Sequence, residues 1–185
     1  MTPGDPLTGP TSGQGRALAT FLRVLHRVPV ADAAARGLPE GSETLRMRRA
    51  VLGRFTDDVV PLLPGPARAS ALSLFERLTA APADVVVHGD LGPEHVLVRG
   101  DAITGVIEWS DAPTGDLAKD LAWALHDTPA PFAAAVAEGY GITPAQRERA
   151  LDRQRIGPFY VVAHGLDTGA PEHVASGLQR ITHRR

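Results

Sequence analysis

The sequence predicts an α+β fold that is predominantly helical, with a small β-hairpin set among the helices. Apolar residues recur at three- and four-residue spacing over most of residues 14–80, which is typical of helices buried on one face. Between residues 84 and 107 the period changes to two and β-branched residues dominate, and the helical spacing then returns. For 185 residues we expect one domain with a single sizeable core.

The first part of the chain is expected to be helical after an irregular start. Residues 1–13 are rich in Gly, Pro, Thr and Ser, so we expect a flexible lead-in before the folded domain of residues 14–185. Ser42 is a plausible N-cap for the second of the helices that follow. We expect these helices over residues 14–27, 42–60 and 67–78.

The middle of the chain is expected to form short strands. The residues Arg99 to Ala102 have turn chemistry between the last two strands. If Val98 pairs with Ile103 across this turn, antiparallel register sets His95 opposite Val106. The expected strands cover residues 84–87, 96–98 and 103–107.

The last part of the chain returns to helices. Asp116 can cap the first of them, and Pro158 predicts a kink or break in the longest. The expected helices cover residues 117–126, 132–138, 144–164 and 171–181.

Composition excludes several classes of function. A net charge of −2, from 19 basic and 21 acidic residues, gives no electrostatic reason to expect nucleic acid or a membrane as partner. The absence of cysteine excludes disulfides and thiolate metal sites. No apolar run approaches the ~20 residues that span a bilayer, and no basic-then-apolar segment follows Met1, so we expect a cytoplasmic protein. Nothing in the sequence predicts its oligomeric state.

Three polar residues are expected to converge at the open end of the hairpin. The first strand leads directly into Asp90, and the pairing of the other two strands brings His95 and Glu108 to the same end. Phosphoryl transfer needs a carboxylate that orients and deprotonates the acceptor hydroxyl, and ligands that hold Mg²⁺ against nucleotide phosphates. Asp90 suits the first role, and His95 with Glu108 the second.

Two motifs carry a family resemblance: HGDLGPEHVLV at residues 88–98 and GVIEWSDAPTGDLAKDLAW at residues 105–123. Together they resemble the signature of the aminoglycoside and macrolide phosphotransferases, which share the protein-kinase-like fold. In that family, Asp90 corresponds to the catalytic base, His95 stands at an Asn metal ligand, and Glu108 stands at an Asp metal ligand.

The resemblance implies a fold, a reaction and its cofactors. It covers the larger C-terminal lobe of that fold, with a catalytic loop at residues 88–95 and a metal-binding segment at residues 105–120. It implies transfer of the γ-phosphoryl group of ATP or GTP to a hydroxyl of a small molecule, assisted by Mg²⁺ or Mn²⁺, and with it antibiotic resistance. Aminoglycoside, macrolide, sugar and aminoalcohol acceptors all stay open.

The smaller N-terminal lobe of the fold is expected to be missing. That lobe supplies the phosphate-covering loop and a lysine, whereas the one lysine of this chain, Lys119, lies inside the second motif. A misplaced start, a fragment and true loss of the lobe all stay open. A non-catalytic pseudokinase or interaction module is therefore an alternative, and a metal-dependent hydrolase that uses His88, Asp90 and His95 is a further one.

We expect structural roles for several other residues. His88 is expected to make a structural hydrogen bond, Asp116 to cap its helix, and Asp120 to bond backbone groups of the loop. Trp109 and Trp123 are expected in the core. We assign only packing or surface roles to the dispersed histidines His26, His126 and His164.

Overall fold

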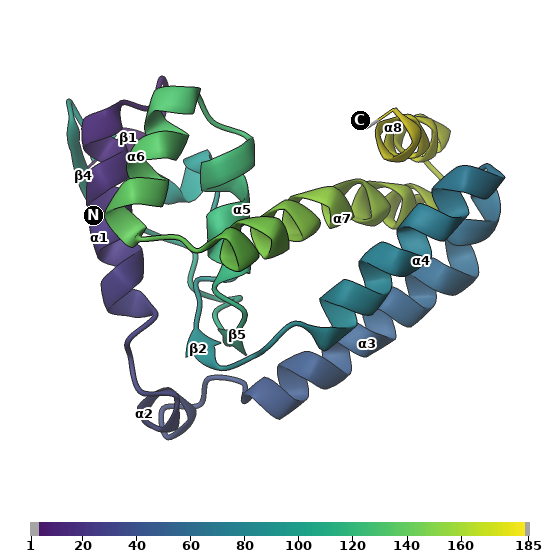
Figure 1. Ribbon diagram of the computed structural model, residues 1–185, viewed down its shortest axis with the longest axis horizontal. Helices are drawn as coiled ribbons and strands as arrows, with labels where there is room; N and C mark the ends of the chain where they lie inside the picture. The colour runs from purple at the N-terminus through teal and green to yellow at the C-terminus, as the bar shows by residue number, and fades with distance from the viewer. Residues whose placement is uncertain (1–3, 184–185) are drawn as a thin grey trace. The chain divides into compact units, whose positions relative to one another are not determined.

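The computed structural model describes residues 4–183 and confirms an α+β fold dominated by helices (Figure 1). The described chain divides into two compact units, of which unit 1 comprises residues 4–44 with 82–151 and unit 2 comprises residues 45–81 with 152–183. Each unit has its own cluster of buried hydrophobic residues. The expectation of a single core is therefore wrong, because the buried residues of the long helices in unit 2 pack on one another.

Unit 1 contains all of the strands in the described chain. A three-stranded antiparallel sheet has the order β1-β3-β4, and β2 pairs separately with β5. The strands are β1 (Asp5–Pro6), β2 (Val85–Val86), β3 (Val96–Arg99), β4 (Ala102–Val106) and β5 (Thr114–Gly115), with a 3₁₀ turn η2 (Pro93–His95). The helices are α1 (Ser12–Leu25), α2 (Val30–Ala34), α5 (Ala118–His126), α6 (Ala130–Tyr140) and the start of α7 (Pro144–Thr168).

Regular structure begins earlier than the composition of the first residues suggests. Asp5 and Pro6 pair with β3, and Leu7 is buried with its N–H donating to the carbonyl of Val96 at 2.9 Å. The expected irregular lead-in is therefore wrong from Asp5 onward, because strand pairing and burial of Leu7 outweigh the local preference of Gly and Pro. The part of that expectation that concerns residues 1–3 lies outside the described residues.

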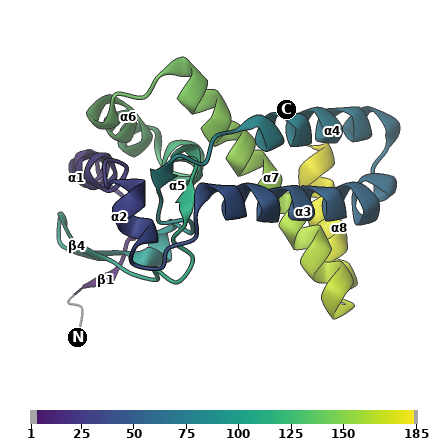
Figure 2. The same ribbon diagram turned by 90° about the horizontal axis from the view of Figure 1, so that it is seen from below.

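Helix α1 begins with a capping box and packs closely on α6. The Thr11 hydroxyl accepts from the Gln14 N–H at 3.3 Å, while the Gln14 side chain accepts from the Thr11 N–H at 2.9 Å. A Cβ at Gly15 would lie 2.8 Å from the Phe132 carbonyl, and one at Gly139 would lie 3.0 Å from the Ala19 Cβ. Glycines thus allow the two helices to lie side by side (Figure 1, Figure 2).

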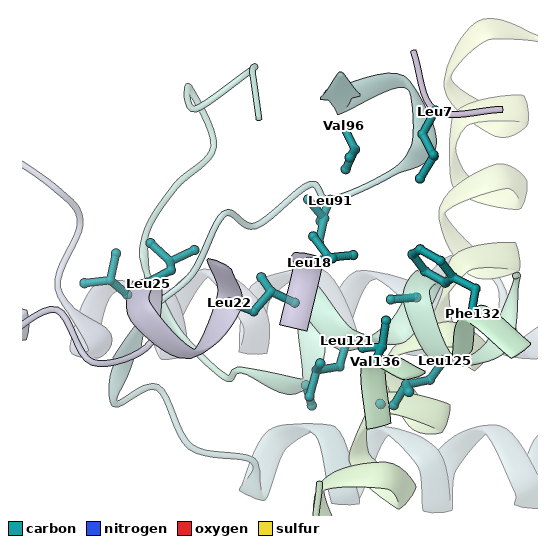
Figure 3. Packing of buried hydrophobic residues seen from close by; sticks show 14 of the residues in the cluster. Leu7, Leu18, Leu22, Leu25, Leu91, Val96, Leu121, Leu125, Phe132 and Val136 are labelled. Carbon is teal, nitrogen blue, oxygen red and sulfur yellow. The ribbon is translucent and has the colours of Figure 1, made fainter. Parts of the chain in front are cut away.

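The core of unit 1 joins α1 to the hairpin and to the later helices. Leu18 and Leu22 of α1, Val96 of β3, Leu121 of α5 and Phe132 of α6 are all fully buried. Figure 3 shows these side chains gathered in one cluster. Their burial fixes the hairpin and the segment around residues 88–95 against a rigid helical base.

The hairpin contains a bulge that shifts its register by one residue. Val98 pairs with Ile103 as expected, but Leu97 pairs with Gly105, so Thr104 is an extra residue in β4. In consequence the His95 carbonyl accepts from the Ile107 N–H at 3.0 Å. The prediction that His95 lies opposite Val106 is therefore wrong by one position.

Unit 2 is a helical unit with an aromatic core. Phe55, Phe75 and Phe159 are buried with ring centroids 5.0 to 6.2 Å apart. Pro158 does not break α7, which is one helix as far as Thr168. The unit comprises α3 (Gly41–Asp58) from residue 45 on, η1 (Val60–Leu62), α4 (Gly65–Ala80), the rest of α7 and α8 (Pro171–Thr182). Within residues 4–183, no helix is both long and apolar enough to cross a membrane.

Candidate active site

A buried carboxylate anchors the loop that follows β2. Asp120, in the first turn of α5, has no exposed surface, and its Oδ1 and Oδ2 accept from the N–H groups of Gly89 and His88 at 2.9 and 2.8 Å. The sequence predicts that Asp120 bonds backbone groups of the loop, and both of these contacts are with backbone N–H groups of the loop. A carboxylate that accepts backbone N–H groups in a buried place makes strong, directional bonds. The loop is therefore tied to α5 at the two residues before Asp90.

His88 adds a second fixed point. Its ring is fully buried, and Nε2 must donate to the Ile107 carbonyl 2.7 Å away because a carbonyl only accepts. The proton on Nε2 leaves Nδ1 to accept from the Asp90 N–H at 3.2 Å. One imidazole thus connects the loop to the end of the hairpin.

Gly89 is required by the path of the chain between these two residues. Its φ is +89°, and a Cβ there would lie 2.5 Å from the carbonyl oxygen of Asp111. Only glycine combines that backbone angle with so close an approach. The turn at Gly89 directs His88 inward while Asp90 faces solvent.

Asp90 presents an exposed carboxylate on a constrained backbone. Its side chain is 65% exposed, whereas its N–H donates to His88 and its carbonyl accepts from His95 Nδ1 at 2.6 Å. The Asp90 Oδ2 lies 3.7 Å from the same Nδ1. The carboxylate can therefore meet a substrate while its main chain stays in place.

His95 and Glu108 have the donor atoms that a divalent metal needs. The bond to Asp90 places a proton on His95 Nδ1, which leaves the lone pair of Nε2 for another partner. Glu108 is exposed just beyond β4. Residues 4–183 contain no group of three His, Cys, Asp or Glu side chains that could hold a metal by themselves. Mg²⁺ beside a nucleotide commonly takes only one or two protein ligands, since phosphates and water supply the others.

Asp116 supports the start of α5. Its Oδ1 accepts from the Ala118 N–H at 3.1 Å, and Arg149 Nε lies 3.4 Å from the same oxygen. The helix begins at Ala118 and its formal N-cap is Leu117, one residue later than the sequence predicts. The carboxylate nevertheless bonds the first helical N–H, as a cap does.

The structure disagrees with one alternative and one expectation about this segment. A hydrolase centre built from His88, Asp90 and His95 is not supported, because both ring nitrogens of His88 have protein partners and Gly89 turns Asp90 away from it. Trp109 is 41% exposed and covers the His88 ring edge-on at a centroid distance of 4.8 Å. Its Nε1–H donates to the Val106 carbonyl, so it caps the hairpin end and does not enter the core.

The sequence reasoning missed three residues that support the site. His26 Nε2 lies 3.1 Å from Asp120 Oδ2, and the Tyr140 hydroxyl lies 2.8 Å from His26 Nδ1. Arg149 pairs with Asp116. No local pattern marks these residues, since His26 and Asp120 are 94 positions apart.

The sequence pattern of the phosphotransferase enzyme family, APH, matches residues 2–153. The chain belongs to this family. The APH match includes α1, the catalytic-loop candidate, the hairpin and α5, which together form the candidate site.

Individual relatives agree with the family. The chain is 33% identical over 126 residues to viomycin phosphotransferase of Streptomyces vinaceus, a match that covers 64% of this chain and 43% of that protein. The chain thus spans less than half the length of this curated relative.

Solved structures show the same fold. The GDP and kanamycin complex of APH(2")-IIia matches 98% of this chain and 67% of its own, with a TM-score of 0.84 at 21% identity. The apoenzyme of macrolide 2'-phosphotransferase MphH from Brachybacterium faecium matches 100% of this chain and 69% of its own, with a TM-score of 0.75 at 23% identity.

Proposed function

We propose that this protein moves the γ-phosphoryl group of ATP or GTP to a hydroxyl of a small molecule, with Asp90 as the catalytic base. The environment of Asp90 supports the proposal most directly. Its carboxylate is 65% exposed, while its backbone N–H and carbonyl are both hydrogen-bonded. A base of this kind must reach its substrate and yet keep its orientation. Asp90 meets both requirements.

The proposed reaction assigns a role to each of three residues. The Asp90 carboxylate accepts a hydrogen bond from the acceptor hydroxyl, orients its oxygen toward the γ-phosphorus and takes the proton as the new O–P bond forms. The bond from the γ-phosphorus to the β–γ bridging oxygen breaks, and the nucleoside diphosphate leaves. The His88 and His95 contacts hold the Asp90 main chain during this step.

We propose that His95 Nε2 and the Glu108 carboxylate hold the divalent metal, Mg²⁺ or Mn²⁺. When bound, the ion neutralises charge on the nucleotide phosphates. His95 is suited to this because its other ring nitrogen is fixed by the Asp90 carbonyl, the usual way in which a ligating histidine is oriented.

The substrates of the relatives support a proposal for the acceptor class. One neighbour is seen with GDP and kanamycin, another is a macrolide 2'-phosphotransferase, and the curated relative is a viomycin phosphotransferase. We propose that the acceptor here is likewise an antibiotic hydroxyl and that the donor is a purine nucleoside triphosphate.

A transfer assay separates this proposal from the pseudokinase alternative. The chain is joined to the smaller lobe of viomycin phosphotransferase and incubated with γ-labelled ATP or GTP, Mg²⁺ or Mn²⁺, and kanamycin, a macrolide or viomycin. A catalytic lobe transfers label to at least one acceptor. A pseudokinase transfers none, although the fusion is folded by circular dichroism.

A further inference from the structure

His26 lies where helix α1 ends, and its side chain faces the anchor of the catalytic-loop candidate. The side chain is only 3% exposed, and its Nε2 is 3.1 Å from Asp120 Oδ2. The same oxygen accepts from the His88 N–H at 2.8 Å. Two successive hydrogen bonds through Asp120 therefore connect His26 to the main chain just before Asp90.

The direction of each bond in this group follows from its chemistry. A carboxylate oxygen only accepts, so in its contact with Asp120 the His26 Nε2 carries a proton and donates it. Burial, and next to it the charge of Asp120, raise the pKa of Tyr140, which keeps the hydroxyl protonated. The Tyr140 hydroxyl holds the other ring nitrogen, 2.8 Å away.

The helices that supply His26 and Tyr140 are fixed against each other. His26 is the C-cap residue of α1, and Tyr140 is the last residue of α6. Gly139, next to Tyr140, packs against Ala19 of α1 so closely that a Cβ there would lie 3.0 Å from the Ala19 Cβ. The ring of His26 is consequently held by two helices as well as by its own hydrogen bonds.

Without His26, the buried carboxylate would keep only its two backbone donors. A buried charge that loses a donor is costly unless it moves to find another partner. Any such movement of Asp120 would also move the N–H groups of His88 and Gly89.

We propose that His26 is a positioning residue that acts through Asp120 to hold the main chain at His88 and Gly89, and thereby the place of the Asp90 carboxylate. The proposal rests on the proposed function only where it calls Asp90 the base. Its structural part concerns backbone bonds that can be measured without any turnover.

Two variants of similar polarity test the proposal in the 185-residue chain. His26→Gln places an amide N–H near the position of Nε2, facing Asp120, whereas His26→Asn places its amide near Nδ1, facing Tyr140. Amide hydrogen exchange is followed by NMR at His88 and Gly89, relative to amides of α4. We expect exchange at both residues to become about tenfold faster or more in His26→Asn and to stay slow in His26→Gln. Unchanged exchange in a folded His26→Asn chain overturns the proposal.

A second test uses the unmodified chain, so it does not depend on the folding of a variant. The ¹⁵N chemical shifts of His26 are expected to show a protonated Nε2 that exchanges slowly with water. An unprotonated Nε2 overturns the proposal.

Kinetics of the fusion protein then separate the two claims. If transfer is observed, His26→Asn lowers kcat about tenfold or more with little change in KM for the nucleotide, and His26→Gln restores it. If no protein transfers phosphate but the exchange rates respond as expected, the proposed function fails and the positioning role stands.

Discussion

Glu108 has a left-handed backbone, with φ 62°, which no other non-glycine residue adopts within residues 4–183. This conformation costs an ordinary side chain about 1–2 kcal/mol, and it persists where the surroundings enforce it. Its position just after β4 puts the strained residue at the proposed metal site. The strained backbone supports a functional role for Glu108, which is more than a solvated surface residue.

Glu108→Asn should raise the free energy of unfolding by about 0.5–1 kcal/mol, because Asn tolerates the left-handed region better than Glu. Urea unfolding measures the change, and Glu108→Gln is the matched control because it removes the charge but keeps the strain. Equal stability of the Asn and Gln variants would show that the backbone at residue 108 is not strained.

The same side chain predicts a metal preference. Mg²⁺ requires tight octahedral geometry, and Glu is one methylene longer than the Asp that the family motif has at this position. Imidazole at His95 also favours transition metals over Mg²⁺. We expect faster transfer with Mn²⁺ than with Mg²⁺, and we expect Glu108→Asp to reduce that difference. Full activity of the unmodified protein with Mg²⁺ alone would argue against this.

Candidate site residues can be predicted where a motif contains them, and not where only a long-range contact brings them to the site. Asp90, His95 and Glu108 stand in a local pattern whose chemistry is readable. His26, Tyr140 and Arg149 contribute through single long-range bonds, and their sequence neighbours give no hint of a partner. The apolar character of Trp109 predicts a place in the core, but its indole N–H donates to a carbonyl at the exposed end of the hairpin.

At the scale of elements, the packing of α1 on α6 sets the geometry beneath the site. Gly15→Ala should lower the free energy of unfolding by about 1–3 kcal/mol, because its Cβ would lie 2.8 Å from the Phe132 carbonyl. Gly13→Ala is the control in the same helix, since its Cβ meets only the Thr11 hydroxyl at 3.6 Å. We expect that control to be neutral or to stabilise by up to about 1 kcal/mol. Thermal unfolding of both variants decides, and an equal loss in the two would refute the close-packing argument.

An exposed ion pair joins α3 to α7 within unit 2. Arg54 bonds Asp167 and Asp58, and its hydrogen bond holds the pKa of Asp167 below the ordinary value of 3.8. A lowered carboxyl pKa stabilises the fold above pH 3.8, and that contribution disappears as the pH falls through the lowered pKa.

Arg54→Gln should therefore reduce stability near neutral pH and make it fall less steeply below pH 3.8. Urea midpoints measured across this range at low salt provide the comparison, and Asp167→Asn should flatten the profile in the same way. Parallel profiles of Arg54→Gln and the unmodified chain would mean that the pair makes no pH-dependent contribution.

Helices and strands can be predicted where buried residues recur at a regular spacing. They are missed where a short strand forms only because a distant segment pairs with it. The spacing of Leu18 and Leu22 predicts α1, and β-branched residues predict β3. The two-residue strands β1 and β5 have no period to detect and exist because β3 and β2 pair with them. The bulge at Thr104 is likewise a property of the paired hairpin, which explains the error of one residue at His95.

At the scale of the whole molecule, chain length predicts one core, whereas the described residues form two. Total hydrophobic content limits how much can be buried but does not say how helices partition it. The candidate site lies entirely within unit 1, as do His26 and Tyr140. The chain spans only 43% of viomycin phosphotransferase.

Asp90 is the proposed base of a phosphotransferase. The most direct test compares label transfer by Asp90→Asn and Asp101→Asn in the fusion with the smaller lobe. Both side chains are exposed, so neither change should alter stability by more than about 0.5 kcal/mol. We expect Asp90→Asn to lower kcat by about 10²–10⁴-fold and Asp101→Asn to keep the unmodified rate. Transfer by Asp90→Asn at the unmodified rate would contradict the account.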